Sequence, residues 1–178
     1  EQHRMLEAEA QLLQDIAEKN PDVMIALENA RPYLSQSPYT YAECMVPLKE
    51  QILRVNRRNV NITLDFGHLF MASQFYAFDP LAAVRQIKEQ VVHTHVHDNF
   101  GGTVHHWEKQ QTHQLPFGKG DSHMPVGYGQ IPIQAILDIL LPDYDGLLIM
   151  ELRSRYFSDI KASLDNLSAL AAASNGRT

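Results

Sequence analysis

VNITLD, residues 60–65, is rich in β-branched residues and is predicted to be a strand that ends on a carboxylate, and the fold class follows from the recurrence of such segments. Residues 23–28 (VMIALE) and 147–151 (LLIME) repeat it, and residues 91–96 (VVHTHV) form a variant rich in histidine. The continuous apolar run of residues 23–27 is typical of a strand that is covered on both faces. The sequence therefore predicts four buried strands, each with a polar side chain at or near its end.

Helical patterns separate these strands. Apolar residues recur at helical spacing from Met5 to Ile16, and prolines mark helix starts at Pro47, Pro80 and Pro132. A closing helix is expected from Ile160 onward. Strands that alternate with helices imply βαβ units with right-handed crossovers and a parallel sheet. The predicted fold class is α/β, with one domain over residues 1–178.

Composition limits the classes of function. The chain has 178 residues, 44% of them hydrophobic, and lacks a run long enough to span a membrane, so we expect a cytoplasmic protein with no membrane partner. The single cysteine, Cys44, excludes an internal disulfide and a cysteine-rich zinc site. A net charge of −6 argues against nucleic acid as a partner. Any metal must therefore be held by His, Asp and Glu.

The polar residues at the strand ends are candidate metal ligands: Glu28, Asp65, His95 and Glu151. The carboxyl ends of parallel strands in a barrel converge on one mouth, so these four residues are expected to meet. Three carboxylates and one imidazole suit Mn, Mg, Co or Zn and leave positions for substrate oxygens. For any one carboxylate alone, a helix cap or a salt bridge is the more common role. The prediction depends on the set.

Further polar residues form a second tier around this set. His68 follows Asp65, and Asp121 with His123 lies in the last long loop. Strand alternation puts His97 on the same side as His95, where it either packs in a hydrogen-bonded row or contacts substrate. Arg153 either holds an anionic group of a substrate or forms a salt bridge to a neighbouring helix.

Five segments, taken in order, resemble a known family. They are Leu27-Glu28-Asn29, Leu64-Asp65-Phe66-Gly67-His68, His95-Val96-His97-Asp98-Asn99, Asp121-Ser122-His123 with Gly127-Tyr128-Gly129, and Met150-Glu151. Together they are similar to the xylose-isomerase-like barrel superfamily, which holds sugar isomerases and epimerases, inosose dehydratases and endonuclease IV. The resemblance implies the C-terminal four βα units of a TIM (β/α)8 barrel. A full barrel needs about 250 residues, so the N-terminal strands are expected to come from a longer chain or from another one.

The epimerase branch of this superfamily implies one catalytic centre. Residues matching Glu28, Asp65, His95 and Glu151 would hold one divalent ion, and the two glutamates would also act as acid and base. The implied reaction is proton abstraction beside a metal-chelated carbonyl of a sugar, sugar phosphate or inositol-like polyol. His68 would then bind a substrate hydroxyl, and Asp121 and His123 would serve as extra metal ligands or as substrate contacts.

The endonuclease IV branch implies a different centre. There the same four residues, together with His68, Asp121 and His123, would share up to three zinc ions that cleave a phosphodiester. The flanking residues Asn29–Tyr33 and Phe66–His68 differ from that branch, which favours the sugar reaction. A third alternative is a barrel fragment that binds metal without turnover. Since four strands leave two unpaired edges, we expect association with a second copy or with the missing half.

Overall fold

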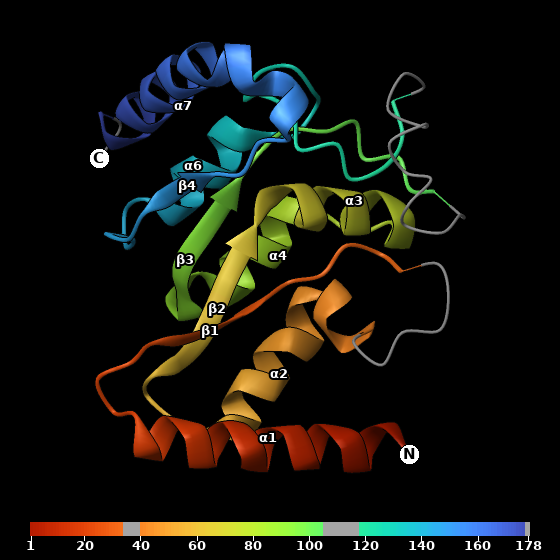
Figure 1. The fold of residues 1–178 in the computed structure, drawn as a ribbon, viewed down its shortest axis with the longest axis vertical. Coiled ribbons are helices and arrows are strands. Elements are labelled where there is room, and N and C mark those ends of the chain that lie inside the picture. Colours follow the sequence, from red (N-terminus) through yellow and green to blue (C-terminus); the bar gives the residue numbers. More distant parts are fainter. Residues whose placement is uncertain (34–39, 105–117, 177–178) are drawn as a thin grey trace.

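The computed structural model describes residues 1–33, 40–104 and 118–176, and within them the strands form a single parallel sheet (Figure 1). The strands lie in the order β1 (Ile25–Glu28), β2 (Val60–Asp65), β3 (Val91–Val96) and β4 (Leu148–Met150). Each strand runs parallel to its neighbours. The α/β class and the four predicted strands are confirmed.

Helices cover one face of this sheet in the order in which they occur in the chain. They are α1 (Gln2–Lys19), α2 (Met45–Val55), α4 (Pro80–Ile87), α6 (Ile133–Leu140) and α7 (Ile160–Asn175), each packed against the next. Figure 1 shows α1 at one end of this layer and α7 at the other. Ile62, Leu64 and Val96 of the sheet are fully buried in the same apolar core as residues of these helices. A parallel sheet with helices along one face is the arrangement found in the wall of a (β/α)8 barrel.

One helix was not predicted from the sequence. Helix α3 (Phe66–Tyr76) follows β2 with no intervening loop and lies at the C-terminal end of the sheet. Its first six residues include Phe66, Leu69, Phe70 and Met71, all buried, so it has no polar face to reveal a helical period. Short 3-10 turns complete the description: η1 (Thr40–Glu43), η2 (Lys88–Gln90) and η5 (Ser154–Asp159).

The strand register brings the predicted ligands onto one face of the sheet. Glu28 pairs with Thr63, Asp65 with His95, and His95 with Ile149. Because paired residues and residues two apart point to the same side, all four strand-end residues point away from the helix layer. They point into what is the barrel interior in a closed (β/α)8 fold.

A bulge in β3 makes this alignment work. Ile62 pairs with Val91 but the next residue, Thr63, pairs with His93, so Val92 is an extra residue in the strand. Without it, His93 would pair with the helix-facing Leu64, and both histidines would point toward the helix layer. The bulge therefore sends both histidines to the side on which Asp65 lies.

Strand and helix boundaries differ from the prediction by one or two residues. Strand β1 begins at Ile25 rather than Val23, and α2 begins at Met45 with Pro47 in its first turn. The side-chain amide of Asn59 donates to the carbonyls of Ala17, Asn20 and Val23 at 3.2, 3.1 and 3.0 Å. These bonds hold the α1–β1 connection in a turn, so the strand starts later.

The two outer strands have one free edge each. Within the described residues, the sheet ends at β1 on one side and at β4 on the other. Among the helices of this part of the chain, none is long and apolar enough to cross a membrane.

Candidate metal centre

The four predicted ligands lie together at the C-terminal ends of the strands. One ligand atom from each of Glu28, Asp65, His95 and Glu151 lies within 4.8 Å of all the others. Nδ1 of His95 is 3.2 Å from Oε1 of Glu28, 3.3 Å from Oε2 of Glu151 and 3.9 Å from Oδ2 of Asp65. One imidazole nitrogen is thus surrounded by three carboxylates that come from three different strands.

The chemistry of this donor set fits a divalent cation. Three carboxylates at this spacing repel one another strongly unless positive charge lies among them. Carboxylate oxygens with one imidazole nitrogen are the ligands that hard and borderline divalent ions prefer. The residues present therefore suit the ion that the sequence pattern predicted.

The three carboxylate ligands differ in the exposed fraction of their side chains. The side chain of Asp65 is 0% exposed, whereas those of Glu28 and Glu151 are 38% and 48% exposed. A substrate at the mouth can reach the two glutamates but cannot reach Asp65. Asp65 is therefore suited to hold an ion, and the glutamates can both hold an ion and exchange protons with a substrate.

Asp65 is fixed from several directions. Its Oδ1 accepts a hydrogen bond from the backbone N–H of His68 at 2.7 Å, which caps α3. Its two oxygens lie 3.1 and 3.2 Å from Nε2 of the buried His97. Burial opposes ionisation, but the charges of His97 and His68 outweigh it and lower the pKa of Asp65 to about 2. The carboxylate is therefore ionised at neutral pH.

A second group of potential ligands lies beside the first. His68, His97, Asp121 and His123 also offer ligand atoms within 4.8 Å of one another. Oδ2 of Asp121 is 2.9 Å from Nε2 of His123 and 3.5 Å from Nε2 of His68. The rings of His97 and His123 stack with centroids 3.9 Å apart. The structure thus brings together all the second-tier residues that the sequence analysis singled out, except Arg153.

Charge pairing governs the pKa values in this second group. Burial disfavours charge on His68, yet Asp65 and Asp121 outweigh it and raise the pKa of His68 to about 10. The same balance raises the pKa of His123, mainly through Asp121. The pKa of Asp121 lies well below its usual value, because hydrogen bonds to His123 and His68 overcome the effect of burial.

Arg153 forms hydrogen bonds to the loop that carries Asp121 and His123. Its guanidinium donates to the backbone carbonyl of Asp121 through Nε at 3.2 Å and Nη2 at 2.8 Å. Its backbone N–H donates to the carbonyl of His123 at 3.1 Å. Arg153 thereby ties the segment after β4 to the loop that carries Asp121 and His123. A substrate contact by Arg153 stays a prediction.

Buried polar residues outside the predicted ligand set support the centre. Asp98 is 2% exposed and accepts hydrogen bonds from the backbone N–H groups of Asn99, Gly127 and Ile131 at 2.9, 3.0 and 3.1 Å. A Cβ atom on Gly129 would lie 2.4 Å from Oδ1 of Asp98. The two glycines therefore let the loop pass close to Asp98.

Other buried polar residues join this support. Arg31 is 5% exposed and its Nε lies 3.7 Å from Oδ2 of Asp121. Asn29 and Asn99 are fully buried next to the strand ends. No spacing rule in the sequence marks these residues, because each has a partner in a distant segment: Asp121 for Arg31, Asp65 for Asn29 and Gly67 for Asn99.

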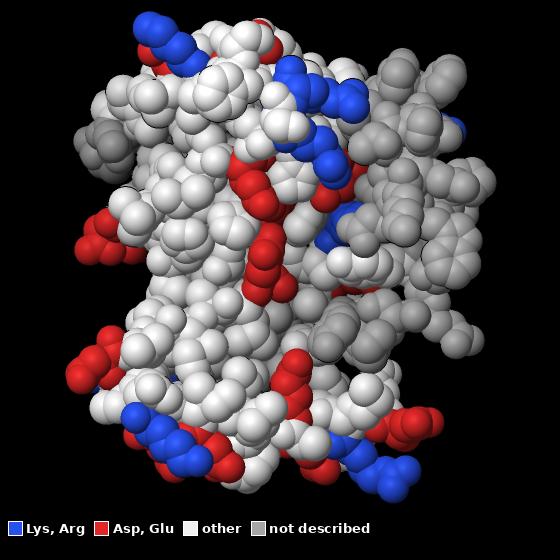
Figure 2. All heavy atoms as spheres, viewed as in Figure 1, with Lys and Arg blue, Asp and Glu red and all other residues white. Residues whose placement is uncertain are grey.

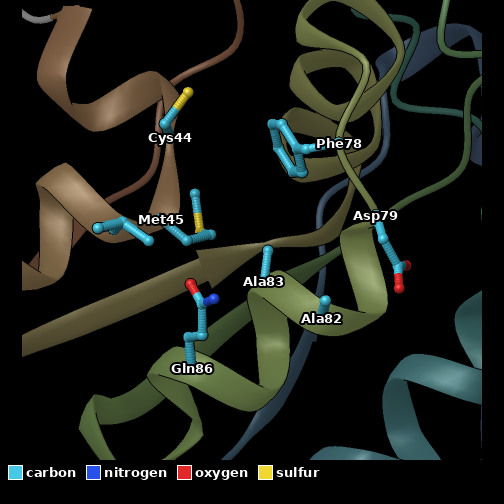
Figure 3. Close-up of a pocket in the computed structure, with 8 residues that line it drawn as sticks. Cys44, Met45, Phe78, Asp79, Ala82, Ala83 and Gln86 are labelled. Carbon is cyan, nitrogen blue, oxygen red and sulfur yellow. The ribbon is translucent and has the colours of Figure 1, made fainter.

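Pockets of the described residues differ in their distance from the centre, as two of them show. One of about 350 Å³ borders Glu28 and His68 and is also lined by Tyr33 and Tyr41. Another of about 280 Å³ lies between α2 and α4, where Cys44, Met45, Phe78 and Ala83 surround it (Figure 3). The second pocket has none of the clustered ligands in its lining, so only the first is placed to hold a molecule that contacts the centre.

Acidic side chains lie along the middle of the face shown in Figure 2, with basic side chains close above and beside them and others towards the lower end. The acidic strip favours the approach of a cation.

Comparison with solved structures shows the fold of this chain. A xylose isomerase domain protein from Alicyclobacillus acidocaldarius aligns with a TM-score of 0.70 and 20% identity over 98% of this chain and 61% of its own. The 3-keto-D-glucoside 4-epimerase from E. coli aligns at 0.63 and 20% over 95% of this chain and 53% of its own. The IOLI protein, solved with a zinc atom, aligns at 0.66 and 17% over 98% and 57%.

The alignments also show how much of each solved structure this chain matches. The chain spans little more than half the length of the solved structures it matches. Comparison with curated proteins gives no match. The sequence profile of the xylose isomerase-like TIM barrel matches residues 2–173, and the chain therefore belongs to the xylose isomerase-like TIM barrel family.

Proposed function

We propose that this chain carries the metal centre of a divalent-metal-dependent isomerase or epimerase that acts on a sugar, a sugar phosphate or a related polyol. The observation that carries the proposal is the cluster of three carboxylates around Nδ1 of His95, with two of them exposed at the mouth. Fold similarity to an epimerase supports the reaction class.

The two glutamates are proposed as the acid–base pair. When bound, a divalent ion would polarise a carbonyl and an adjacent hydroxyl of the substrate and so acidify the neighbouring C–H bond. One glutamate takes the proton from this carbon, and the other, initially protonated, donates a proton to the opposite face. The first glutamate ends protonated and the second ionised, so the proton count of substrate and product is the same.

The origin of the two glutamates fits transfer between faces. Glu28 ends β1 and Glu151 follows β4. These are the two edge strands of the sheet, so the two glutamates approach His95 from opposite sides. Because each reaches the centre from a different side, a substrate held between them presents one face to each. His68, which borders the same pocket as Glu28, is proposed to bind a substrate hydroxyl.

A small, polyhydroxylated molecule is the proposed substrate. The pocket next to Glu28 has a volume of about 350 Å³ and mixes aromatic and polar lining residues. Sugars bind well to such surfaces, because ring C–H groups pack on tyrosine and hydroxyl groups bond to polar side chains. The proposed cofactor is one Mn, Mg, Co or Zn ion held by Glu28, Asp65, His95 and Glu151.

One observation favours a second candidate function. The adjacent cluster of His68, His97, Asp121 and His123 has the ligand types and spacing for a further ion. A centre with up to three zinc ions would suit cleavage of a phosphodiester, as in endonuclease IV. Metal stoichiometry therefore distinguishes the two candidates.

The free sheet edges support a proposed partner. An open parallel sheet exposes unpaired backbone groups along β1 and β4, and a complementary set of strands would satisfy them. We propose that a second copy of the chain or the other half of the barrel fills this role and completes the pocket.

Metal content and turnover of a Glu151→Gln variant test the proposed function. We expect about one divalent ion per wild-type chain, held by the cluster around His95, and loss of turnover on ketoses in Glu151→Gln with an unchanged circular dichroism spectrum. Glu50→Gln, on the exposed side of α2, is the matched control and should behave as wild type.

Each result has a clear meaning. Three zinc ions with nicking of abasic DNA would favour the phosphodiesterase. Metal binding without turnover on either substrate class would favour a non-catalytic module. No bound metal, or an unchanged rate in Glu151→Gln, would refute the assignment of this residue.

A further inference from the structure

Asn29 is a buried polar residue next to the candidate metal centre. It directly follows Glu28 at the end of β1, and it is fully buried while Glu28 is partly exposed. A buried side-chain amide without partners costs about 1–3 kcal/mol, so its contacts show what it does.

The side chain of Asn29 makes two hydrogen bonds to the backbone of one residue in the next strand. Its Oδ1 accepts a hydrogen bond from the backbone N–H of Asp65 at 2.7 Å, and its Nδ2 donates to the backbone carbonyl of Asp65 at 3.0 Å. The regular β1–β2 pairing ends at Glu28 and Thr63. Asn29 thus continues the pairing of the two strands with its side chain, at the position where both carry a ligand.

The backbone of Asn29 adds two further contacts. Its N–H donates to the carbonyl of Thr63 at 3.3 Å, and its carbonyl oxygen lies 2.9 Å from Nδ1 of His68. A carbonyl oxygen can only accept, so Nδ1 of His68 carries the hydrogen. Nε2 is then the nitrogen that faces Asp121, at 3.5 Å from Oδ2. One residue therefore constrains both Asp65 and His68.

We propose that Asn29 is a positioning residue of the metal centre, which sets the distance between the carboxylates of Glu28 and Asp65 and orients His68. This inference rests on the proposed function, because it assumes that the cluster binds a metal. It assigns a role to a residue outside the two ligand clusters of the described residues, which acts through the backbone of Asp65 and the ring of His68.

The chemistry at this position is specific for asparagine. Alanine would leave the N–H and the carbonyl of Asp65 without these partners inside a buried site. Aspartate would keep the volume but would place a second oxygen against the carbonyl of Asp65. Neither residue can bridge both groups as the amide does.

Cobalt binding to the full-length protein tests the inference, because the visible spectrum of bound Co²⁺ reports the arrangement of its ligands. We expect Asn29→Ala to weaken Co²⁺ binding by about 10–100-fold, as loss of supporting hydrogen bonds does at other metal sites. Asn29→Asp, which keeps the side-chain volume, should fold and give a Co²⁺ spectrum different from that of wild type.

Asn59→Ala is the matched control. The Asn59 amide also makes its hydrogen bonds to backbone carbonyls, but it lies before β2, at the opposite end of the strand from Asp65. We expect this variant to lower the thermal stability of the metal-free protein while leaving Co²⁺ affinity and spectrum unchanged.

The outcomes separate the inference from the proposed function. Wild-type affinity and spectrum in both Asn29 variants would overturn the inference alone. An equal loss of affinity in Asn59→Ala would also overturn it, because stability and not positioning would then explain the effect. No Co²⁺ binding by the wild-type protein would overturn the metal centre and the inference together.

Discussion

Gly67 lies so close to His97, beside Asp65, that a side chain at position 67 would overlap the imidazole ring. A Cβ atom on Gly67 would lie 1.9 Å from Cε1 and 2.4 Å from Nε2 of His97. His97 is fully buried, and its Nε2 contacts both oxygens of Asp65. The imidazole can stay next to the ligand carboxylate only because residue 67 has no side chain. Glycine is required here by close approach and not by a special backbone angle.

We therefore expect Gly67→Ala to lower the free energy of unfolding by about 1–3 kcal/mol, a typical cost of overpacking. The loss should appear although alanine favours a helix over glycine by about 1 kcal/mol. Urea unfolding of the metal-free protein measures it. Gly176→Ala is the control, because the nearest atom to the added Cβ is the carbonyl oxygen of Ala172 at an ordinary 3.6 Å.

A double variant shows whether His97 is the cause. In Gly67→Ala/His97→Ala the collision is gone, so the combined loss should be smaller than the sum of the two single losses by about 0.5–3 kcal/mol. Additive losses would mean that the added methyl group acts elsewhere.

At the scale of elements, two aspartates show how similar local roles lead to different functions. Asp65 caps α3 through the N–H of His68, and Asp79 caps α4 through the N–H of Leu81 at 2.9 Å. Asp65 is buried among metal-binding side chains, whereas Asp79 is exposed. Only the surroundings of the two caps differ.

Asp79→Ala should lower the free energy of unfolding by about 1 kcal/mol, the usual cost of losing an N-cap. Asp79→Asn keeps an accepting oxygen and should lose much less. Metal affinity should be unchanged in both variants, since Asp79 lies outside the two ligand clusters of the described residues. Denaturant titration and metal titration of the same samples check both expectations, and a loss of metal affinity would contradict them.

The same elements show what a sequence can predict. The bounds of β3 and the Asp79 cap follow from local patterns, because buried strands and N-caps depend on neighbouring residues. Helix α3 was missed because its first half is buried on all sides. The meeting of Glu28, Asp65, His95 and Glu151 was predictable from topology, since parallel strands end at one edge.

The supporting residues were beyond reach for a physical reason. Asn29, Asp98 and Arg31 act through backbone groups or side chains that lie far away in the sequence. Such contacts depend on the exact approach of loops, and local patterns carry no information about it. The roles of the site residues themselves stay predictions until they are measured.

For the whole molecule, the open sheet predicts association. Leu147 and Ile149 expose apolar side chains next to the free edge of β4, and Leu147 is 66% exposed. Exposed apolar strands at a sheet edge invite pairing with another chain. We expect the 178-residue chain on its own to sediment as a dimer or a larger species rather than at 20.2 kDa.

A charge at this edge should reduce the association. Leu147→Lys places a solvated ammonium group where a partner strand would approach. Leu53→Lys is the matched control, because Leu53 is 59% exposed but lies on α2, away from the edges. Sedimentation velocity should show a lower mass for Leu147→Lys alone. A wild-type chain that stays monomeric at high concentration would contradict the proposed partner surface.

The extra residue in β3 has a consequence for how relatives of this chain are compared. Val92 shifts the strand by one position, and only this shift brings His95 into line with Asp65. A relative that lacks this one residue but keeps the rest of the segment would therefore turn its matching histidine toward the helix layer, although the histidine itself is unchanged. Loss of catalytic function in this family should accordingly be inferred from strand register and not from aligned columns.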